Sequence, residues 1–181
     1  EQREYSLFFC QLEAAETAIW LTEASPSEKQ GIDLPSEPEG WQRQSFKMAT
    51  GSGKTVVMSM LIAWQALNKI ATPTDTRFTK NIFIVAPGLT VKDRLRVLKP
   101  EREDNFYQKF NIVPSSMWQE LLQAKIVVEN WHTLAPVNEN YGPKVVKKGP
   151  ESDEAFTRRV VPDIGNAQNI WLRSARAIRR Q

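Results

Sequence analysis

MATGSGKT, at residues 48–55, is the stretch of sequence that decides the fold of this chain. Its two glycines let the backbone turn so that successive N–H groups point toward an anion. Lys54 supplies a positive charge for the β- and γ-phosphates of a nucleotide, and Thr55 supplies a hydroxyl for Mg²⁺. The pattern resembles G-x-x-x-x-G-K-[ST], with Met48 in place of the first glycine. The residues expected to hold the phosphates are Thr50, Gly51, Ser52, Gly53, Lys54 and Thr55.

The sequence on either side of this loop supports the same interpretation. Residues 44–48 alternate weakly between polar and apolar side chains, which predicts a short buried strand. Residues 56–64 are apolar on nearly every face, which predicts a helix whose N-terminus adds a positive dipole end to the phosphate site. The alternative is a Gly/Ser turn before a core helix. The order of strand, loop and helix favours the nucleotide site.

Composition limits the class of protein. The chain has 181 residues, of which 41% are hydrophobic and 25% charged, as expected for one soluble globular domain with a sizeable core. No apolar run is long enough to span a membrane and no secretory signal precedes the loop, so we expect a cytoplasmic protein. Cys10 is the only cysteine, which excludes an internal disulfide. With a single histidine as well, a zinc site is not expected.

Alternating apolar and turn-forming segments predict a mostly parallel α/β fold. A parallel sheet of three or four strands would then be flanked by helices on both faces. The expected elements after the loop and its helix are strands at 81–86, 106–113 and 125–130, and helices at 90–98 and from Ser115 or Ser116 to Leu122; a further helix at 10–23 precedes the loop.

The C-terminal part of the chain is basic. Residues 156–181 carry six arginines against Asp163 alone, a net charge of +5 in a chain whose total is +3. Residues 170–178 predict an amphipathic helix with arginines beside its apolar face. We weigh a nucleic-acid contact equally against a solvated helix face or a covered interface. The sequence therefore divides into residues 1–135 and a Lys/Gly/Pro-rich connection with a basic helix at 136–181.

Phe9 and Gln11 form a second candidate site. A buried glutamine amide offers both a donor and an acceptor to the edge of an adenine, and a neighbouring ring can stack on the base. Two phenylalanines before a helix more commonly belong to the core or to a hydrophobic staple. The adjacent phosphate loop favours the adenine interpretation.

Four segments together resemble a known family. FFCQLEAAETAIW, FKMATGSGKTVVMSMLIAW, IFIVAPGLTVKDRL and IVVENWHTL follow the order and spacing of the first motor domain of superfamily 2 helicases. They are most similar to the DEAD/DEAH-box group related to the Res subunit of type III restriction enzymes, over most of residues 5–135. The resemblance implies a RecA-like P-loop domain, incomplete at its C-terminus, that binds ATP and Mg²⁺. It also implies nucleic acid, DNA rather than RNA, and a second motor domain or a methyltransferase as partners.

The resemblance assigns roles to individual residues. Gln11 resembles the adenine-reading glutamine, and Lys54 and Thr55 the catalytic residues of motif I. For Lys92 and Arg94 a solvated helix face is an equal alternative, and for His132 an ordinary structural hydrogen bond is the commoner role. The residues at the positions of motifs Ia and Ib, which touch the nucleic-acid backbone in the family, are Pro87, Gly88, Thr90, Lys92, Arg94, Asn130 and His132.

The sequence departs from the family after residue 135. No Asp-Glu-x-Asp/His segment occurs there, and Asp153-Glu154 follows no apolar strand, so we interpret these acids as the first turn of a helix beside a Ser152 cap. We therefore expect ATP binding with impaired hydrolysis, and a truncated or frameshifted gene product is one hypothesis for the departure. One alternative is a helicase-derived module that binds nucleic acid or protein without turnover. Another is a nucleotide kinase, which the Gln11 segment argues against.

Overall fold

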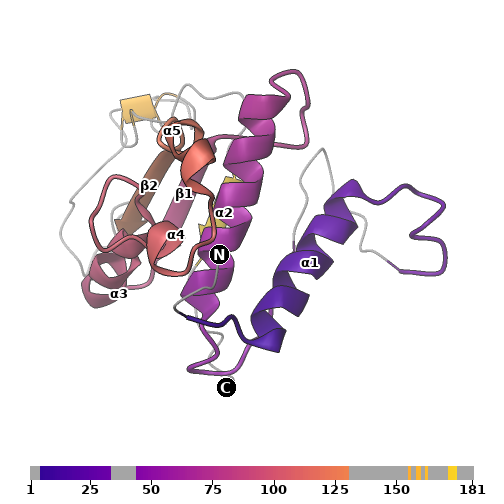
Figure 1. Ribbon diagram of the computed structural model, residues 1–181, viewed down its shortest axis with the longest axis horizontal. Coiled ribbons are helices and arrows are strands. Elements are labelled where there is room, and N and C mark those ends of the chain that lie inside the picture. The colour runs from indigo at the N-terminus through magenta and orange to yellow at the C-terminus, as the bar shows by residue number, and fades with distance from the viewer. Residues whose placement is uncertain are drawn as a thin grey trace.

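The computed structural model describes residues 5–33 and 44–130, together with residues 155, 158–159, 162 and 171–174. Two helices precede the first strand, and three more helices lie between the first strand and the second (Figure 1). The helices are α1 (Phe9–Glu23), α2 (Lys54–Ala71), α3 (Leu89–Arg94), α4 (Phe106–Lys109) and α5 (Trp118–Leu121), with 3-10 turns η1 (Leu95–Leu98) and η2 (Ser115–Met117); the strands are β1 (Asn81–Ala86), β2 (Lys125–Asn130) and β3 (Trp171–Ser174).

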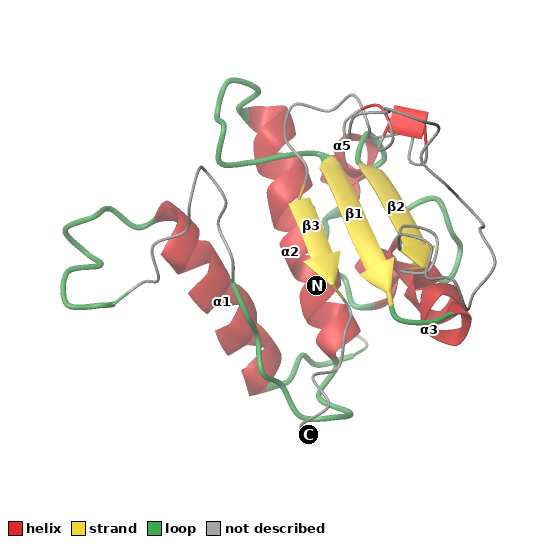
Figure 2. Cartoon of the chain, turned by 180° about the vertical axis from the view of Figure 1, so that it is seen from behind, coloured by secondary structure: helices red, strands yellow, loops and turns green. Residues whose placement is uncertain are grey.

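The three strands form a parallel sheet in the order β2-β1-β3. Ala86, the last residue of β1, is aligned with Asn130, the last residue of β2. The carboxyl ends of the strands therefore meet at one edge of the sheet (Figure 2). The N-terminus of α2 lies at the same end of the molecule, because α2 runs opposite to the strands it covers. This arrangement confirms the predicted parallel α/β fold.

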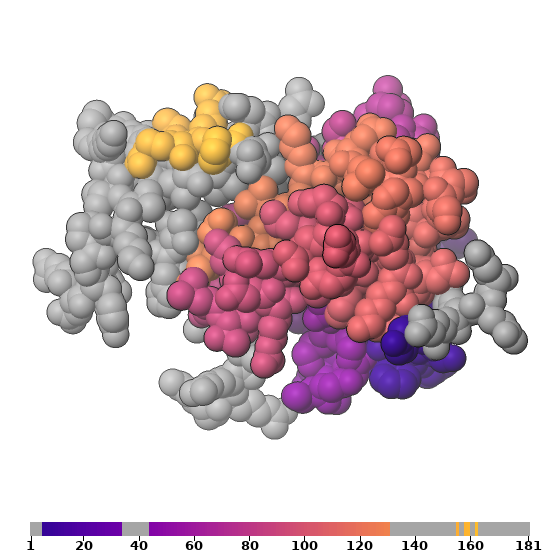
Figure 3. All heavy atoms as spheres, turned by 60° about the vertical axis from the view of Figure 1, so that its left-hand side comes forward, coloured from indigo at the N-terminus to yellow at the C-terminus, as the bar shows by residue number. Residues whose placement is uncertain are grey.

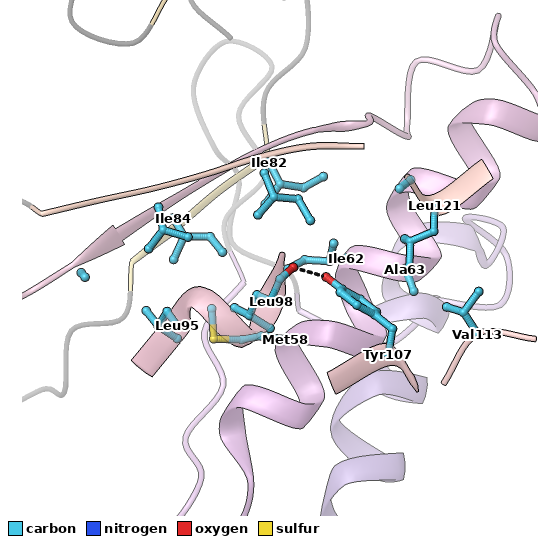
Figure 4. Close-up of a cluster of buried hydrophobic side chains, with 14 residues drawn as sticks. Met58, Ile62, Ala63, Ile82, Ile84, Leu95, Leu98, Tyr107, Val113 and Leu121 are labelled. Carbon is cyan, nitrogen blue, oxygen red and sulfur yellow. Dashed lines mark hydrogen bonds between the residues drawn. The ribbon is translucent and has the colours of Figure 1, made fainter. Parts of the chain in front are cut away.

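The main core lies between the sheet and α2. Alternate residues of β1, among them Ile82 and Ile84, are fully buried, as expected for a strand with one face on the core. They pack in one apolar cluster with Met58 and Ile62 of α2 and with side chains of η1, α4 and α5 (Figure 4). Among the described residues this core occupies one face of the sheet. The predicted cover on both faces is therefore not confirmed.

Helix α1 packs on α2, on the side away from the sheet (Figure 1). The contact is made by Ala15 and Ala18 of α1 against Val57 and Leu61 of α2, all of them buried. Small alanine side chains let the two helix backbones approach closely. The start of α1 is thereby brought beside the loop that precedes α2.

The prediction of a strand over residues 106–113 is wrong, because these residues form α4 and a turn. The Asn105 side chain accepts a hydrogen bond from the Gln108 backbone N–H (2.9 Å) and so caps the helix. Tyr107 is fully buried and donates its hydroxyl proton to the carbonyl of Leu98 (2.7 Å). Asn111, with φ of 45°, turns the chain away. The aromatic residues Phe106 and Tyr107, which indicated a strand, thus belong to a single helical turn.

Three further predictions need correction. Residues 44–48 form no strand; Phe46 and Met48 pack instead beside the contact between α1 and α2. Trp171–Ser174 is a strand rather than part of a helix, because the backbone groups on the second edge of β1 gain hydrogen-bond partners by pairing. Neither Ser115 nor Ser116 caps a helix, since the 3-10 turn there begins after Pro114 without a side-chain cap. Within the described part of the chain, no helix has the length and apolar character needed to cross a bilayer.

We predict that Tyr107→Phe lowers the free energy of unfolding by about 1–3 kcal/mol, because it leaves the buried Leu98 carbonyl without a partner. Burial raises the pKa of Tyr107 above its ordinary value. As pH rises, the Tyr107 hydroxyl therefore loses its proton in the unfolded chain before it does so in the folded chain. The contribution of Tyr107 to the free energy of unfolding consequently falls above a pH of about 10. Urea unfolding of both proteins should give a difference that shrinks in that range. A difference that stays constant from a pH of about 8 to about 11 would contradict the assignment.

Candidate nucleotide site

The loop that precedes α2 has the backbone that a phosphate site requires. Gly51 and Gly53 have φ of 81° and 78°, in the left-handed region that side chains with a Cβ rarely adopt. Helix α2 begins directly after them, at Lys54, with no side-chain cap. The backbone N–H groups of Gly53, Lys54 and Thr55 make no hydrogen bond within the described residues. The positive end of α2 therefore presents free donors for an anion.

The side chains of the loop are turned inward on its own carbonyl groups. The Lys54 ammonium donates to the carbonyls of Met48 (2.9 Å) and Ala49 (2.6 Å). The Ser52 hydroxyl also donates to the Ala49 carbonyl (2.7 Å). A phosphate would offer the lysine a charged acceptor in place of two neutral ones. The exchange favours the phosphate, since charge-assisted hydrogen bonds are roughly twice as strong as neutral ones.

Gln11 joins α1 to this loop. Its side chain is only 4% exposed. The amide oxygen accepts from the Phe8 N–H (3.0 Å), and the amide nitrogen donates to the Ser52 carbonyl (3.0 Å). A primary amide has two donor hydrogens and two acceptor lone pairs, so one of each remains for a ligand. A Cβ on Gly53 would collide with this amide. Gly53 is thus required by its backbone conformation and by the position of Gln11.

Phe8 and Phe9 lie on the surface next to Gln11. Their side chains are 59% and 76% exposed. The alternative that these rings belong to the core is therefore wrong for both. An exposed aromatic ring beside a buried amide with a spare donor and acceptor is an arrangement that suits a planar heterocyclic base.

The chain also places a second group of predicted residues at the carboxyl edge of the sheet. Pro87 and Gly88 follow β1, Asn130 ends β2, and the two strand ends are aligned in register. Leu89 is the most exposed large apolar residue there. Figure 3 shows the surface formed by this part of the chain. The residues brought to this edge are Pro87, Gly88, Thr90, Lys92, Arg94 and Asn130, whereas His132, Ser152, Asp153 and Glu154 lie outside the described residues.

Lys92 is not an independent cation. Its ammonium forms an ion pair with Glu129 of β2 at 2.8 Å, and each of the two side chains is 27% exposed. No local sequence pattern indicates Glu129, because the ion pair depends on how α3 packs against β2. By contrast, Arg94 and Thr90 are exposed at this edge.

The residues of the loop fit a nucleotide with its magnesium ion. In the described part of the chain, no group of three or more Cys, His, Asp or Glu side chains gathers to hold a metal on its own. Thr55, expected to provide a hydroxyl for Mg²⁺, is the second residue of α2.

The chain was compared with known proteins. The family model described as "Type III restriction enzyme, res subunit" matches residues 4–154. No curated protein and no solved structure matches the chain.

The two loop glycines allow a matched test of the Gln11 contact. Gly51→Ala adds a Cβ in open space, so it carries only the cost of a positive φ, about 1–2 kcal/mol. Gly53→Ala carries the same cost and also displaces Gln11. We predict the larger loss of unfolding free energy for Gly53→Ala in urea titrations. The excess should vanish when both variants are made in a Gln11→Ala background. Equal losses in the original background would show that Gln11 does not pack on Gly53.

Proposed function

The chain belongs to the type III restriction enzyme Res subunit family, a family of superfamily 2 helicase motor domains, and we propose that it binds Mg-ATP at the loop before α2. The observation that carries the proposal is the joining of Gln11 to the loop through the Ser52 carbonyl. This contact puts an amide with spare hydrogen-bonding capacity beside a helix N-terminus with free N–H groups. A base and a polyphosphate are the two halves of one ligand that such a site accommodates.

Each loop residue has a defined role in this proposal. Lys54 leaves the Met48 and Ala49 carbonyls and donates to the β- and γ-phosphates. Thr55 would hold Mg²⁺ through its hydroxyl, and the ion would neutralise phosphate charge. Gln11 reads the base edge, and Phe9 stacks on the base.

We propose that hydrolysis by this chain is slow. Residues 136–181 contain no Asp-Glu-x-Asp/His segment to position water and metal. Phosphoryl transfer depends mainly on positioning and charge stabilisation, so the phosphate loop by itself supplies binding and only part of the rate enhancement. Residues 1–135 act as the nucleotide-binding unit in this proposal, with the basic residues of 136–181 as an attached segment.

We further propose that the carboxyl edge of the sheet binds the nucleic-acid backbone, and we favour DNA. Gly88 allows the backbone to approach a phosphate closely, Thr90 offers a hydroxyl and Arg94 offers a positive charge. Such groups bind phosphates and do not distinguish one base from another. Lys92 contributes only when it leaves Glu129. This edge lies at the same end of the molecule as the phosphate loop (Figure 2), so both ligands would bind near each other.

Replacing the loop lysine should remove nucleotide binding. We predict that Lys54→Ala weakens Mg-ATP binding at least about tenfold in calorimetric titrations, because a charged hydrogen bond to phosphate is worth about 1.5–3 kcal/mol. Lys69→Ala is a matched control. Lys69 lies on the same helix and its ammonium also donates to a carbonyl, that of Asp75 (2.9 Å), but in the last turn of α2. Lys69→Ala should leave binding unchanged.

Equal ATP binding by the original chain and Lys54→Ala would contradict the proposed nucleotide site. Salt-dependent DNA binding that survives in both would then favour the interaction module without turnover. Turnover that is fast and independent of DNA would instead favour a phosphotransferase.

Releasing Lys92 should strengthen binding to nucleic acid. We predict that Glu129→Gln tightens binding of a single-stranded oligonucleotide by about threefold, and steepens the dependence of log K on log salt by about 0.7–0.9, because one further phosphate contact becomes available. Asp104→Asn is the control, since it raises net charge equally but releases Arg102, which belongs to the connection between η1 and α4. Fluorescence anisotropy at several salt concentrations measures both quantities. If both variants bind the oligonucleotide more tightly by the same factor, the change in net charge explains the effect and the release of Lys92 does not.

A further inference from the structure

We infer that a cluster of aromatic and cationic side chains on α4 positions the segment that carries the base-binding residues. This cluster, the α4 anchor, consists of Phe106, Lys109 and Phe110, and Tyr5 of the N-terminal segment packs on it. The inference rests on the proposed nucleotide site and adds to it a device that acts on the base and not on the phosphates.

Helix α4 is fixed to the core and is therefore a rigid support. Tyr107 is fully buried and its hydroxyl donates to the Leu98 carbonyl (2.7 Å, Figure 4). Asn105 is 1% exposed and bonds to the Arg102 carbonyl (2.6 Å) as well as to the Gln108 side chain (3.0 Å). Tyr107 thus ties the single turn of α4 to η1, and Asn105 fixes the start of that turn. Its outward-facing residues can hold another segment in place.

Tyr5 rests on these outward-facing residues. Its ring centroid lies 5.6 Å from that of Phe110, at an interplanar angle of 53°, and Phe110 in turn lies 5.1 Å from Phe106 at 67°. The Lys109 ammonium is 5.6 Å from the centroid of Tyr5 and 6.0 Å from that of Phe106. These separations are within the range in which aromatic and cation–π attractions act. In Figure 3 the indigo N-terminal residues border the salmon surface of the segment that follows β1.

The position of Tyr5 constrains the base-binding residues because the connection is short. Only Ser6 and Leu7 lie between Tyr5 and Phe8, and a chain of three residue steps spans at most about 10 Å. The Phe8 N–H donates to the Gln11 side chain, which donates to the Ser52 carbonyl. A continuous series of contacts therefore runs from the core through α4 and Tyr5 to Gln11.

A purely structural role would not require this cluster. Helix α1 is already held by α2 through Ala15 and Ala18. Tyr5 itself is 43% exposed, so its contacts bury little area. What the cluster fixes is the segment ahead of α1, where Phe8 and Phe9 are exposed beside Gln11. The phosphate loop is held in shape by hydrogen bonds among its own residues, from Ser52 and Lys54 to the carbonyls of Met48 and Ala49.

Loss of the α4 anchor should therefore weaken binding of the base and spare binding of the phosphates. In the 181-residue chain, we expect Phe110→Leu to weaken Mg-ATP binding by about three- to tenfold, the range that corresponds to one aromatic pair. Lys109→Met should weaken it by about two- to fourfold through loss of the cation–π contacts. Binding of magnesium tripolyphosphate, which has no base, should change less than about twofold in either variant.

Isothermal titration calorimetry with Mg-ATP and with magnesium tripolyphosphate measures the two affinities. Arg77→Met is the matched control, because Arg77 lies over the Phe78 ring at 5.3 Å in the loop after α2 and does not contact the α4 anchor. It should change neither affinity. Thermal unfolding monitors the fold of each variant; if Phe110→Leu does not fold, the exposed Lys109→Met decides the question.

The ratio of the two affinities separates the possible results. A loss for ATP with tripolyphosphate unchanged supports the positioning role. Equal losses for both ligands, or no loss for either, overturn it while leaving the nucleotide site intact, provided that Lys54→Ala weakens binding of both ligands at least about tenfold. If Lys54→Ala binds ATP as well as the original chain does, the proposed nucleotide site fails and the inference fails with it.

Discussion

The Gln11 side chain determines how the rest of the site is arranged, because its amide must fit between the start of α1 and the phosphate loop. It bonds to the Ser52 carbonyl and lies where any side chain on Gly53 would be. The loop can accept this contact only with a glycine in the left-handed conformation at that position. The amide can reach it only because Ala15 and Ala18 let α1 approach α2 closely. One buried polar group thereby couples two helices and a loop.

The cations expected to bind phosphate are held by acceptors of the protein itself. Lys54 donates to two loop carbonyls, and Lys92 is paired with Glu129. Each ammonium group therefore already has hydrogen-bond acceptors, and a phosphate must replace those acceptors in order to bind it. For Lys54 the partners are neutral, so exchange favours the phosphate. For Lys92 the partner is a carboxylate, and the exchange is closer to balanced. The two ligand surfaces are therefore expected to differ in how readily they bind.

Local sequence patterns predicted the elements that depend on local interactions. Helix α2, strands β1 and β2 and the two positive-φ glycines follow from apolar runs and from the loop sequence. The aromatic residues at 106–110 were misassigned to a strand, since their roles depend on the Asn105 cap and on a buried partner for Tyr107. The pairing of β3 with β1 joins residues about ninety positions apart, and no local pattern contains that information.

The same limit applies to the site. The loop residues and Gln11 were found because their chemistry is encoded in short segments with fixed spacing. Glu129 and the α4 anchor were not found, because they arise where α3 meets β2 and where the N-terminal segment meets α4. Both depend on packing between elements distant in sequence. Residues that modulate a site are in general harder to predict than those that form it, since no motif fixes their positions.

The most direct test of this account is a crystal structure of the chain with Mg-ADP. We expect the Lys54 ammonium to have left the Met48 and Ala49 carbonyls for the β-phosphate, with the Gln11 amide on the base edge and still in contact with the loop. A nucleotide bound elsewhere, with Lys54 still on its carbonyl partners, would contradict the account.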